Sequence, residues 1–140
     1  MAQERVIPVP TPETRHFWDG TTKNELRLQR CTSCEQAYFP PRPFCPNCSS
    51  REVEVFTASG RGRIHTFIIS RFRSPGFETP YSLAVVELEE GPRMMTNIVG
   101  VPQSTDHIEM EMPVEAVFEP VNDEVSLVKF KPAEGKTDAE

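Results

Sequence analysis

Two Cys-x-x-Cys pairs constrain the fold of this 140-residue chain more than any other feature of its sequence. They contain the four cysteines of the chain: Cys31, Cys34, Cys45 and Cys48. Each such turn can present two thiolates to one metal ion while its backbone amides point at the sulfur atoms, and two turns complete a tetrahedral shell. Because cysteine fills every position of that shell, we predict a structural Zn²⁺ site with no open coordination position.

Other interpretations of the cysteines fit less well. Disulfides are typical of secreted proteins, and Met1 to Pro10 lacks the apolar core of an export signal. An iron centre of the rubredoxin kind uses the same four thiolates and is the alternative metal site. A redox dithiol is the weakest interpretation, because nothing resembling a thioredoxin βαβ unit surrounds either pair.

The composition indicates a soluble globular protein, with 37% hydrophobic and 26% charged residues. No apolar run approaches the roughly 20 residues that span a bilayer. We therefore predict a cytoplasmic protein with no membrane partner.

Alternating apolar and polar residues predict a mainly β chain. We expect a short helix with Thr11 as N-cap and Gly20 as its C-terminal stop. One strand is expected around Ile64 to Ile68, and the others lie at 26–30, 51–57, 81–88, 93–99, 114–119 and 125–130. Five strands after Gly60 favour a small closed barrel, because closure removes the exposed edges of a short sheet.

The predicted organisation has three parts. Residues 1–58 form the N-terminal helix and zinc ribbon, residues 59–131 form the barrel, and residues 132–140 form a disordered tail. The tail is polar and charged and has no apolar anchor.

A basic island interrupts a chain of net charge −6. Within residues 61–80, Glu78 is the one acidic residue, and the island consists of Arg61, Arg63, Arg71 and Arg73. On an unbulged strand the four guanidinium groups would share one face, and Ile64 and Ile68 would share the other.

Three interpretations of the arginines carry equal weight. Guanidinium groups match phosphate oxygens, and Gly60 and Gly62 let a backbone approach, so the island can bind the phosphates of CoA. It can also contact a partner protein, or form surface salt bridges with Glu87 or Glu89.

Several motifs in this order resemble a known family. They include Phe17-Trp18, the cysteine ribbon with Tyr38-Phe39-Pro40-Pro41-Arg42, Gly60-Arg61-Gly62, and the stretch from Val85 to Gly91. The chain resembles, over residues 14 to 130, the zinc-ribbon plus OB-fold family of acyl-CoA-associated proteins, small accessory subunits of thiolase-superfamily enzymes. The resemblance implies a rubredoxin-like ribbon followed by a five-stranded OB-fold barrel. One departure is Glu111, which stands where that family usually has glycine before Met-Pro-Val.

The resemblance also implies a function. It suggests a non-catalytic zinc-binding subunit of a thiolase-type acyl-CoA C-acyltransferase or lyase complex, supporting assembly and CoA-thioester binding for C–C bond cleavage or formation. The thiolase-superfamily partner would supply the nucleophilic cysteine, and acyl-CoA would bind at a shared site. A part that is not an enzyme on its own agrees with the residues, because the cysteines are committed to metal and the three histidines, His16, His65 and His107, are scattered.

Aromatic residues mark two expected contact regions. For Phe17 and Trp18 we expect one ring in the core and the other at a partner interface. Phe72 and Phe77 belong to a proline- and glycine-containing loop, which is expected either to contact a partner or ligand or to pack on the barrel.

The alternative function is a nucleic-acid-binding module, because zinc ribbons and OB barrels also serve that purpose. A single-strand binder needs a basic groove lined with aromatic rings, whereas the strands at 81–88 and 114–119 present glutamates. We therefore do not expect nucleic acid to be a partner.

Overall fold

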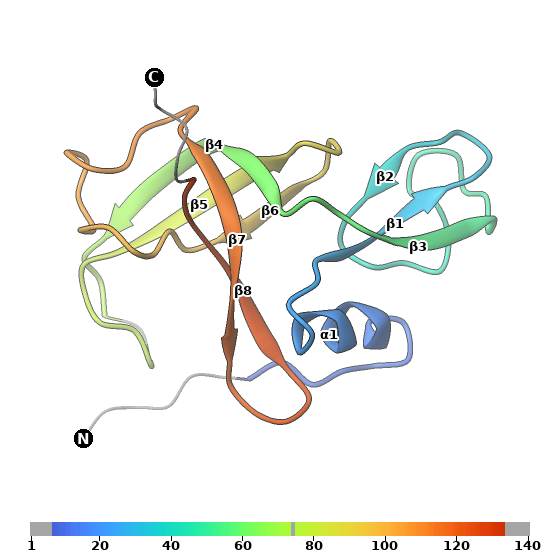
Figure 1. Ribbon diagram of the computed structural model, residues 1–140, viewed down its shortest axis with the longest axis horizontal. Coiled ribbons are helices and arrows are strands. Elements are labelled where there is room, and N and C mark those ends of the chain that lie inside the picture. Colours follow the sequence, from blue (N-terminus) through green and yellow to red (C-terminus); the bar gives the residue numbers. More distant parts are fainter. Residues whose placement is uncertain (1–6, 74, 134–140) are drawn as a thin grey trace.

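The computed structural model describes residues 7–73 and 75–133 of a mainly β protein with one short helix. A three-stranded sheet and a larger curled five-stranded sheet lie side by side, with helix α1 (Arg15–Thr21) next to both (Figure 1). No described helix is long and apolar enough to cross a bilayer.

The smaller sheet holds the cysteine pairs. Strand β1 (Arg27–Cys31) is central and pairs antiparallel with β2 (Ala37–Tyr38) and β3 (Val53–Thr57). Strands expected before the first cysteine pair and after the second are thus confirmed.

The larger sheet has the order β6-β5-β4-β7-β8. Its strands are β4 (Arg61–Ser70), β5 (Tyr81–Leu88), β6 (Arg93–Thr96), β7 (Pro113–Pro120) and β8 (Ser126–Pro132). The chain just after β6 returns to β8: Phe130 N–H donates to Asn97 O (3.1 Å), and Val99 N–H donates to Phe130 O (2.8 Å). These bonds bring the two outer strands together, as the predicted five-stranded OB-type barrel requires.

A bulge at His65 changes which residues of β4 face the core. Ile64 pairs with Val86 on β5, but Thr66 pairs with the adjacent Val85, so one residue is skipped. Ile64 is fully buried, whereas Ile68 is 60% exposed. The predicted shared face of these two isoleucines is therefore wrong, because a bulge of one residue exchanges the two faces of the strand beyond it.

The helix begins and ends later than predicted. Thr14 N–H donates to Thr11 O (3.0 Å), which closes a turn ahead of the helix, and Thr14 rather than Thr11 is the N-cap residue. Gly20 is the penultimate helical residue and not the stop. A Cβ atom at Gly20 would lie 2.7 Å from Arg27 Cγ, so glycine is required there by close packing.

The buried side chains form one core that runs from the helix into the barrel. Its fully buried centre in the barrel includes Ile64, Val86, Ile98 and Phe130. Thr21 joins the helix to β8: its hydroxyl donates to Trp18 O (2.6 Å) and accepts from Ser126 N–H (3.1 Å).

The predicted tail is mostly outside the described residues. Its first residue, Pro132, ends β8, and Ala133 N–H donates to Pro113 O (3.1 Å). Residues 134–140 are not described.

Candidate metal centre and adjoining pocket

The sulfur atoms of all four cysteines gather in one cluster, within 4.8 Å of one another. Cys31 Sγ lies 3.6 Å from Cys48 Sγ, and Cys34 Sγ lies 3.7 Å from Cys45 Sγ. A disulfide has a sulfur–sulfur distance of about 2.05 Å. A tetrahedron with metal–sulfur bonds of about 2.3 Å has edges of about 3.8 Å. The spacing therefore fits four separate thiolates around one zinc ion.

The two cysteine turns repeat the same backbone geometry. Glu35 N–H donates to Cys31 O, and Ser49 N–H donates to Cys45 O, both at 2.8 Å. The residue after the second cysteine of each pair has a positive φ of 66°, although Glu35 and Ser49 both carry side chains. Two similar turns face each other, so each supplies half of the metal shell.

Hydrogen bonds to sulfur favour the thiolate form. The pKa of Cys31 is lowered to about 6, chiefly because the backbone N–H of Cys34 donates to its sulfur. The pKa of Cys34 is lowered first by the side-chain amide of Asn47, which donates to its sulfur at 3.5 Å. For Cys48, a hydrogen bond from the Ser50 backbone lowers the pKa, but its contact with Cys31 and the other thiols raises it to about 12. A divalent cation, when bound, compensates four thiolates that repel one another at this spacing.

The connection between the cysteine turns is fixed by polar contacts to the ribbon strands. Gln29, on β1, is buried, and its side-chain oxygen accepts from Arg42 N–H (2.7 Å). Tyr38, on β2, donates its hydroxyl to Arg42 O (2.9 Å). These contacts hold the proline-containing segment against the sheet.

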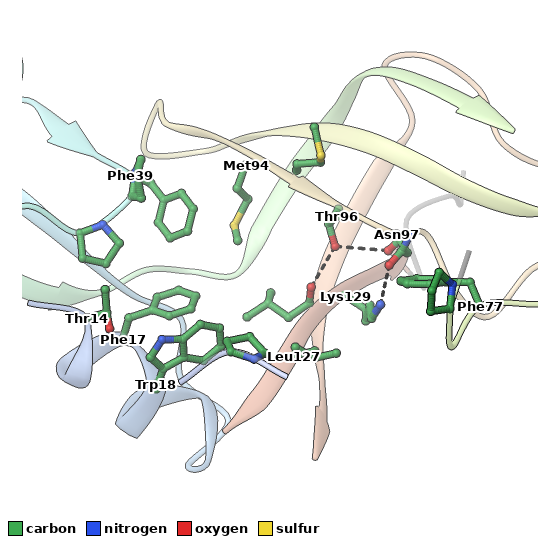
Figure 2. Close-up of a pocket in the computed structure, with 16 residues that line it drawn as sticks. Thr14, Phe17, Trp18, Phe39, Phe77, Met94, Thr96, Asn97, Leu127 and Lys129 are labelled. Carbon is green, nitrogen blue, oxygen red and sulfur yellow. Dashed lines mark hydrogen bonds between the residues drawn. The ribbon is translucent and has the colours of Figure 1, made fainter. Parts of the chain in front are cut away.

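An open pocket of about 610 Å³ lies where the helix, the ribbon connection and the barrel meet (Figure 2). Most of its wall is apolar and comes from the segment before the helix, the helix, the ribbon connection, the loop before β5, and strands β6 and β8: Pro8, Phe17, Trp18, Phe39, Pro40, Pro41, Pro75, Phe77, Met94, Met95, Leu127 and Val128. Its size is within the range of small-molecule sites.

Polar side chains occupy one end of this pocket. Thr96 donates its hydroxyl to Val128 O (2.9 Å), and the Lys129 ammonium donates to Asn97 Oδ1 (Figure 2). Lys129 is only 8% exposed. Its Nζ atom lies 4.0 Å from Glu119 Oε1 and 5.6 Å from the centre of the Phe77 ring. Sequence reasoning missed Lys129; the available signal was a lysine flanked by apolar residues within a predicted strand.

The predicted arginine island does not form one cluster. Arg61 and Arg63 lie at the start of β4, while Arg71 and Arg73 follow its end. The step from Arg63 to Arg71 corresponds to about 26 Å of extended chain at about 3.3 Å per residue. The guanidinium groups are therefore divided between the two ends of the strand.

The first arginine pair borders a groove of about 690 Å³ together with Glu87 and Glu89. Arg61 Nε donates to Glu89 Oε2 at 3.1 Å, and this bond lowers the pKa of the Glu89 carboxyl. Arg63 Nη1 lies 3.9 Å from Glu111 Oε1. The expected surface salt bridge between an arginine of this island and Glu89 is thus present.

The four predicted interface aromatics occupy different environments. Phe17 is buried and lies edge-on to Trp18, whose ring centre is 4.8 Å away; Trp18 is partly exposed and lines the pocket. Phe77 stacks on Tyr81, and Phe72 is 84% exposed. Phe17 is therefore the core member of its pair. The histidines are not brought together either: His16 is on α1, His65 is on β4 and His107 is in the loop before β7.

Comparison with family models identifies both parts of the fold. Residues 18–54 match the model described as "ChsH2, rubredoxin-like zinc ribbon domain", and residues 56–119 match "ChsH2, C-terminal OB-fold domain". These matches confirm the predicted fold class and, with the sulfur cluster, the predicted structural zinc.

Two curated proteins are similar over most of this chain. A "Benzoylsuccinyl-CoA thiolase subunit BbsA" of Thauera aromatica is 34% identical over 107 residues, which cover 76% of this chain and 74% of that protein. A "Probable enoyl-CoA hydratase alpha subunit" of Thermomonospora curvata is 38% identical over 119 residues. That match covers 84% of this chain but only 37% of the longer relative.

Among solved structures, a chain of an "Ltp2-ChsH2(DUF35) aldolase" has a TM-score of 0.79 and 34% sequence identity to this chain. The superposition covers 90% of this chain and 98% of that one. The similar proteins are thus named as subunits or components of acyl-CoA hydratase, thiolase or aldolase assemblies.

Proposed function

Because this chain belongs to the ChsH2 family of zinc-ribbon and OB-fold proteins, we propose that it is a non-catalytic subunit of a thiolase-type acyl-CoA enzyme. In this role it supports assembly of the complex and binding of the CoA thioester, and the partner carries out C–C bond formation or cleavage. The similarity to a benzoylsuccinyl-CoA thiolase subunit, over three-quarters of both chains, is the observation that carries the proposal.

The distribution of nucleophiles supports a non-catalytic role. All four cysteine sulfurs are within the metal cluster, where thiolates committed to a structural ion are not free to attack a thioester. The partner then supplies the nucleophilic cysteine and its acid and base groups.

The outer face of β4, β5 and β6 is the docking surface that suits this partner. Cross-strand pairs place Ile68 beside Leu83, and Met95 beside Val85, on the side of the sheet that faces away from the barrel core. Ile68 is 60% exposed and Met95 is 72% exposed. Phe72, in the segment that follows β4, is also exposed. Neighbouring exposed apolar side chains on a sheet are typical of protein interfaces.

The start of β4 is the part of the predicted arginine island that suits CoA. Arg61 and Arg63 border the same groove, so they can contact phosphate oxygens from one side. Glu87 and Glu89 on the same groove reduce its positive charge, which favours one small anionic group over a polyanion.

Co-purification tests the subunit role. The tagged chain is expected to retain a thiolase-superfamily protein from its native extract, and the complex to have thioester-dependent C–C activity. Ile68→Asp should abolish retention, whereas Val55→Asp, at an exposed position on ribbon strand β3, should preserve it. If nucleic acid is recovered instead, and salt releases it, the nucleic-acid-binding alternative replaces the proposal.

CoA binding is tested on the assembled complex. The double variant Arg61→Ala and Arg63→Ala is expected to weaken CoA binding by about tenfold, about 1.4 kcal/mol, through loss of charged hydrogen bonds. The matched control is the double variant Arg71→Ala and Arg73→Ala. Equal affinities for both double variants would remove the start of β4 from the CoA site.

A further inference from the structure

We propose that the pocket between α1, the ribbon connection and the barrel is a ligand site for an apolar acyl chain, whose carboxylate or carbonyl oxygen is bound by Lys129. The pocket is formed by one chain, its wall is mostly apolar, and Lys129 gives it a positive charge. It adds a site to the proposed subunit role, in which the arginines at the start of β4 serve the CoA phosphates.

The wall of the pocket suits an apolar chain. Aromatic rings from the helix and the ribbon connection face methionine, leucine and valine side chains of the barrel strands (Figure 2). Phe17, Trp18 and Phe39 form a continuous aromatic side, because the rings of Phe17 and Phe39 are 5.3 Å apart and Phe17 contacts Trp18. Burial of a ten-carbon chain against such a wall is favourable, because its methylene groups leave water.

Lys129 makes one end of the pocket positively charged. Among the described residues that line this pocket, it is the one with an ionisable side chain. A lysine on a strand commonly extends its ammonium group to water, but this side chain is 8% exposed and its ammonium donates to Asn97 Oδ1. The positive charge is thus fixed at the polar end of an apolar wall.

A carboxylate near Lys129 belongs to the wall of a different cavity. Glu119, 4.0 Å away from the ammonium, lines a neighbouring cavity and not this pocket, while Lys129 and Asn97 line both. An acceptor oxygen that enters from the apolar side therefore meets the ammonium before it meets Glu119. A cationic head group at the same position is repelled, and its desolvation is not compensated.

Two sources share this ligand chemistry: a free alkanoate, and the acyl part of a CoA thioester. The second source rests on the proposed function. The site itself does not, since it is formed by one chain.

Trp18 is the single tryptophan of the protein and lines the pocket, so its fluorescence reports occupancy directly. The full-length, zinc-loaded chain is titrated with decanoate, decanol and decyltrimethylammonium below their micelle concentrations. Decanoate is expected to give a saturable shift in Trp18 emission, with a Kd at least tenfold below that of the ammonium probe. No saturable shift with decanoate, or equal affinity for the cationic probe, overturns the proposal.

Lys129→Met retains the length of the side chain and removes its charge. This variant should weaken decanoate binding about tenfold and leave decanol binding unchanged. The matched control is Lys131→Met, two residues further along β8, where the ammonium pairs with Glu115. If the Lys129 variant does not fold, the three probes on the unmodified chain still test whether the pocket prefers an anionic head group to a cationic one.

Decanoyl-CoA and the decanoyl thioester of N-acetylcysteamine separate the two sources. Saturable binding of both thioesters supports the acyl part of CoA thioesters as the ligand, whereas binding of decanoate alone supports a free alkanoate. A Trp18 shift on addition of the partner protein, with none for any decyl probe, means that the pocket is a protein interface and overturns the proposal.

Discussion

The ribbon and the barrel are ordered by different forces. In the barrel, buried aliphatic and aromatic residues from every strand share one core. The ribbon strands contribute less to this core: Leu28 of β1 belongs to it, but β3 has no buried residue, and the most buried groups of the cysteine turns are Cys31 and Cys45 themselves. The difference teaches that two β modules of one chain can be stabilised mainly by metal binding in one case and mainly by apolar burial in the other.

This difference has a direct consequence for stability. The ribbon should respond to chelators and to acid, because protons compete with the metal for thiolates. The barrel should respond to changes in core volume. The helix contacts both modules: it packs on β1 of the ribbon, and Thr21 hydrogen-bonds to β8 of the barrel. Unfolding of one module should therefore affect the stability of the other.

The largest effect should come from removal of one metal ligand. We expect Cys45→Ser to release zinc and unfold the ribbon while the barrel strands persist, because metal binding supplies about 10–16 kcal/mol in small zinc domains. Elemental analysis and amide hydrogen exchange measure the two outcomes separately. Ser33→Ala, an exposed change within the other cysteine turn, is the control. Retention of zinc with unchanged melting would contradict the prediction.

The converse experiment is directed at the barrel core. Phe130 is fully buried, and Phe130→Ala should cost about 3–5 kcal/mol of unfolding free energy through lost burial and the cavity that remains. Phe72→Ala, at an 84% exposed ring, should change stability by less than about 0.5 kcal/mol. Urea denaturation compares the two variants. If Phe130→Ala also releases zinc at low urea, the two modules unfold as one unit.

An intermediate effect is expected at the junction. Thr21→Val keeps the shape of the side chain but leaves the buried Ser126 N–H without its acceptor, at a cost of about 1–3 kcal/mol. Thr22→Val, on an exposed residue whose hydroxyl donates to Asp19 O, is the matched control. Hydrogen exchange at α1 and β8 should increase in the Thr21 variant alone. Equal exchange in both variants would show that this hydroxyl does not join the modules.

The smallest effect concerns backbone conformation and has the opposite sign. Glu111 has φ of 69°, in the region where a side chain costs about 1–2 kcal/mol, whereas glycine loses about 0.4–1 kcal/mol through unfolded-chain entropy. Glu111→Gly should therefore stabilise the barrel by about 0.5–1 kcal/mol, measured by urea denaturation. Glu109→Gly, at an exposed neighbour that lacks the positive φ, should be destabilising. A loss of stability in Glu111→Gly would mean that the 3.9 Å contact of Glu111 with Arg63 contributes more than the relief of the left-handed backbone conformation.

The backbone at Glu111 has the left-handed conformation that glycine adopts most readily. Glu111 adopts it while its N–H donates to Ile64 O (2.7 Å), next to the bulge of β4. The turn therefore forms in this protein despite the side chain.

Sequence reasoning succeeded where the signal is local. The strand at 81–88 was predicted with the bounds it has in the structure, because its alternation is uninterrupted. The predicted start of the helix was wrong because Thr11 forms its hydrogen bonds within a turn that precedes the helix. The prediction that Ile68 faces the same side as Ile64 was wrong because of the bulge in β4. The bulge depends on how β4 pairs with β5, and the sequence of β4 alone does not reveal it.

The sequence by itself determined the four metal ligands and the positions of most strands along the chain. Cysteine spacing within each turn and the period of two within each strand are set by neighbouring residues, so they can be predicted from the chain alone. Only the tertiary structure decided that the arginines separate, that Lys129 is buried, and that the helix, ribbon connection and barrel enclose a pocket. Those features depend on which distant segments meet when the core closes, and the free energy of that closure belongs to the whole fold and not to any one segment.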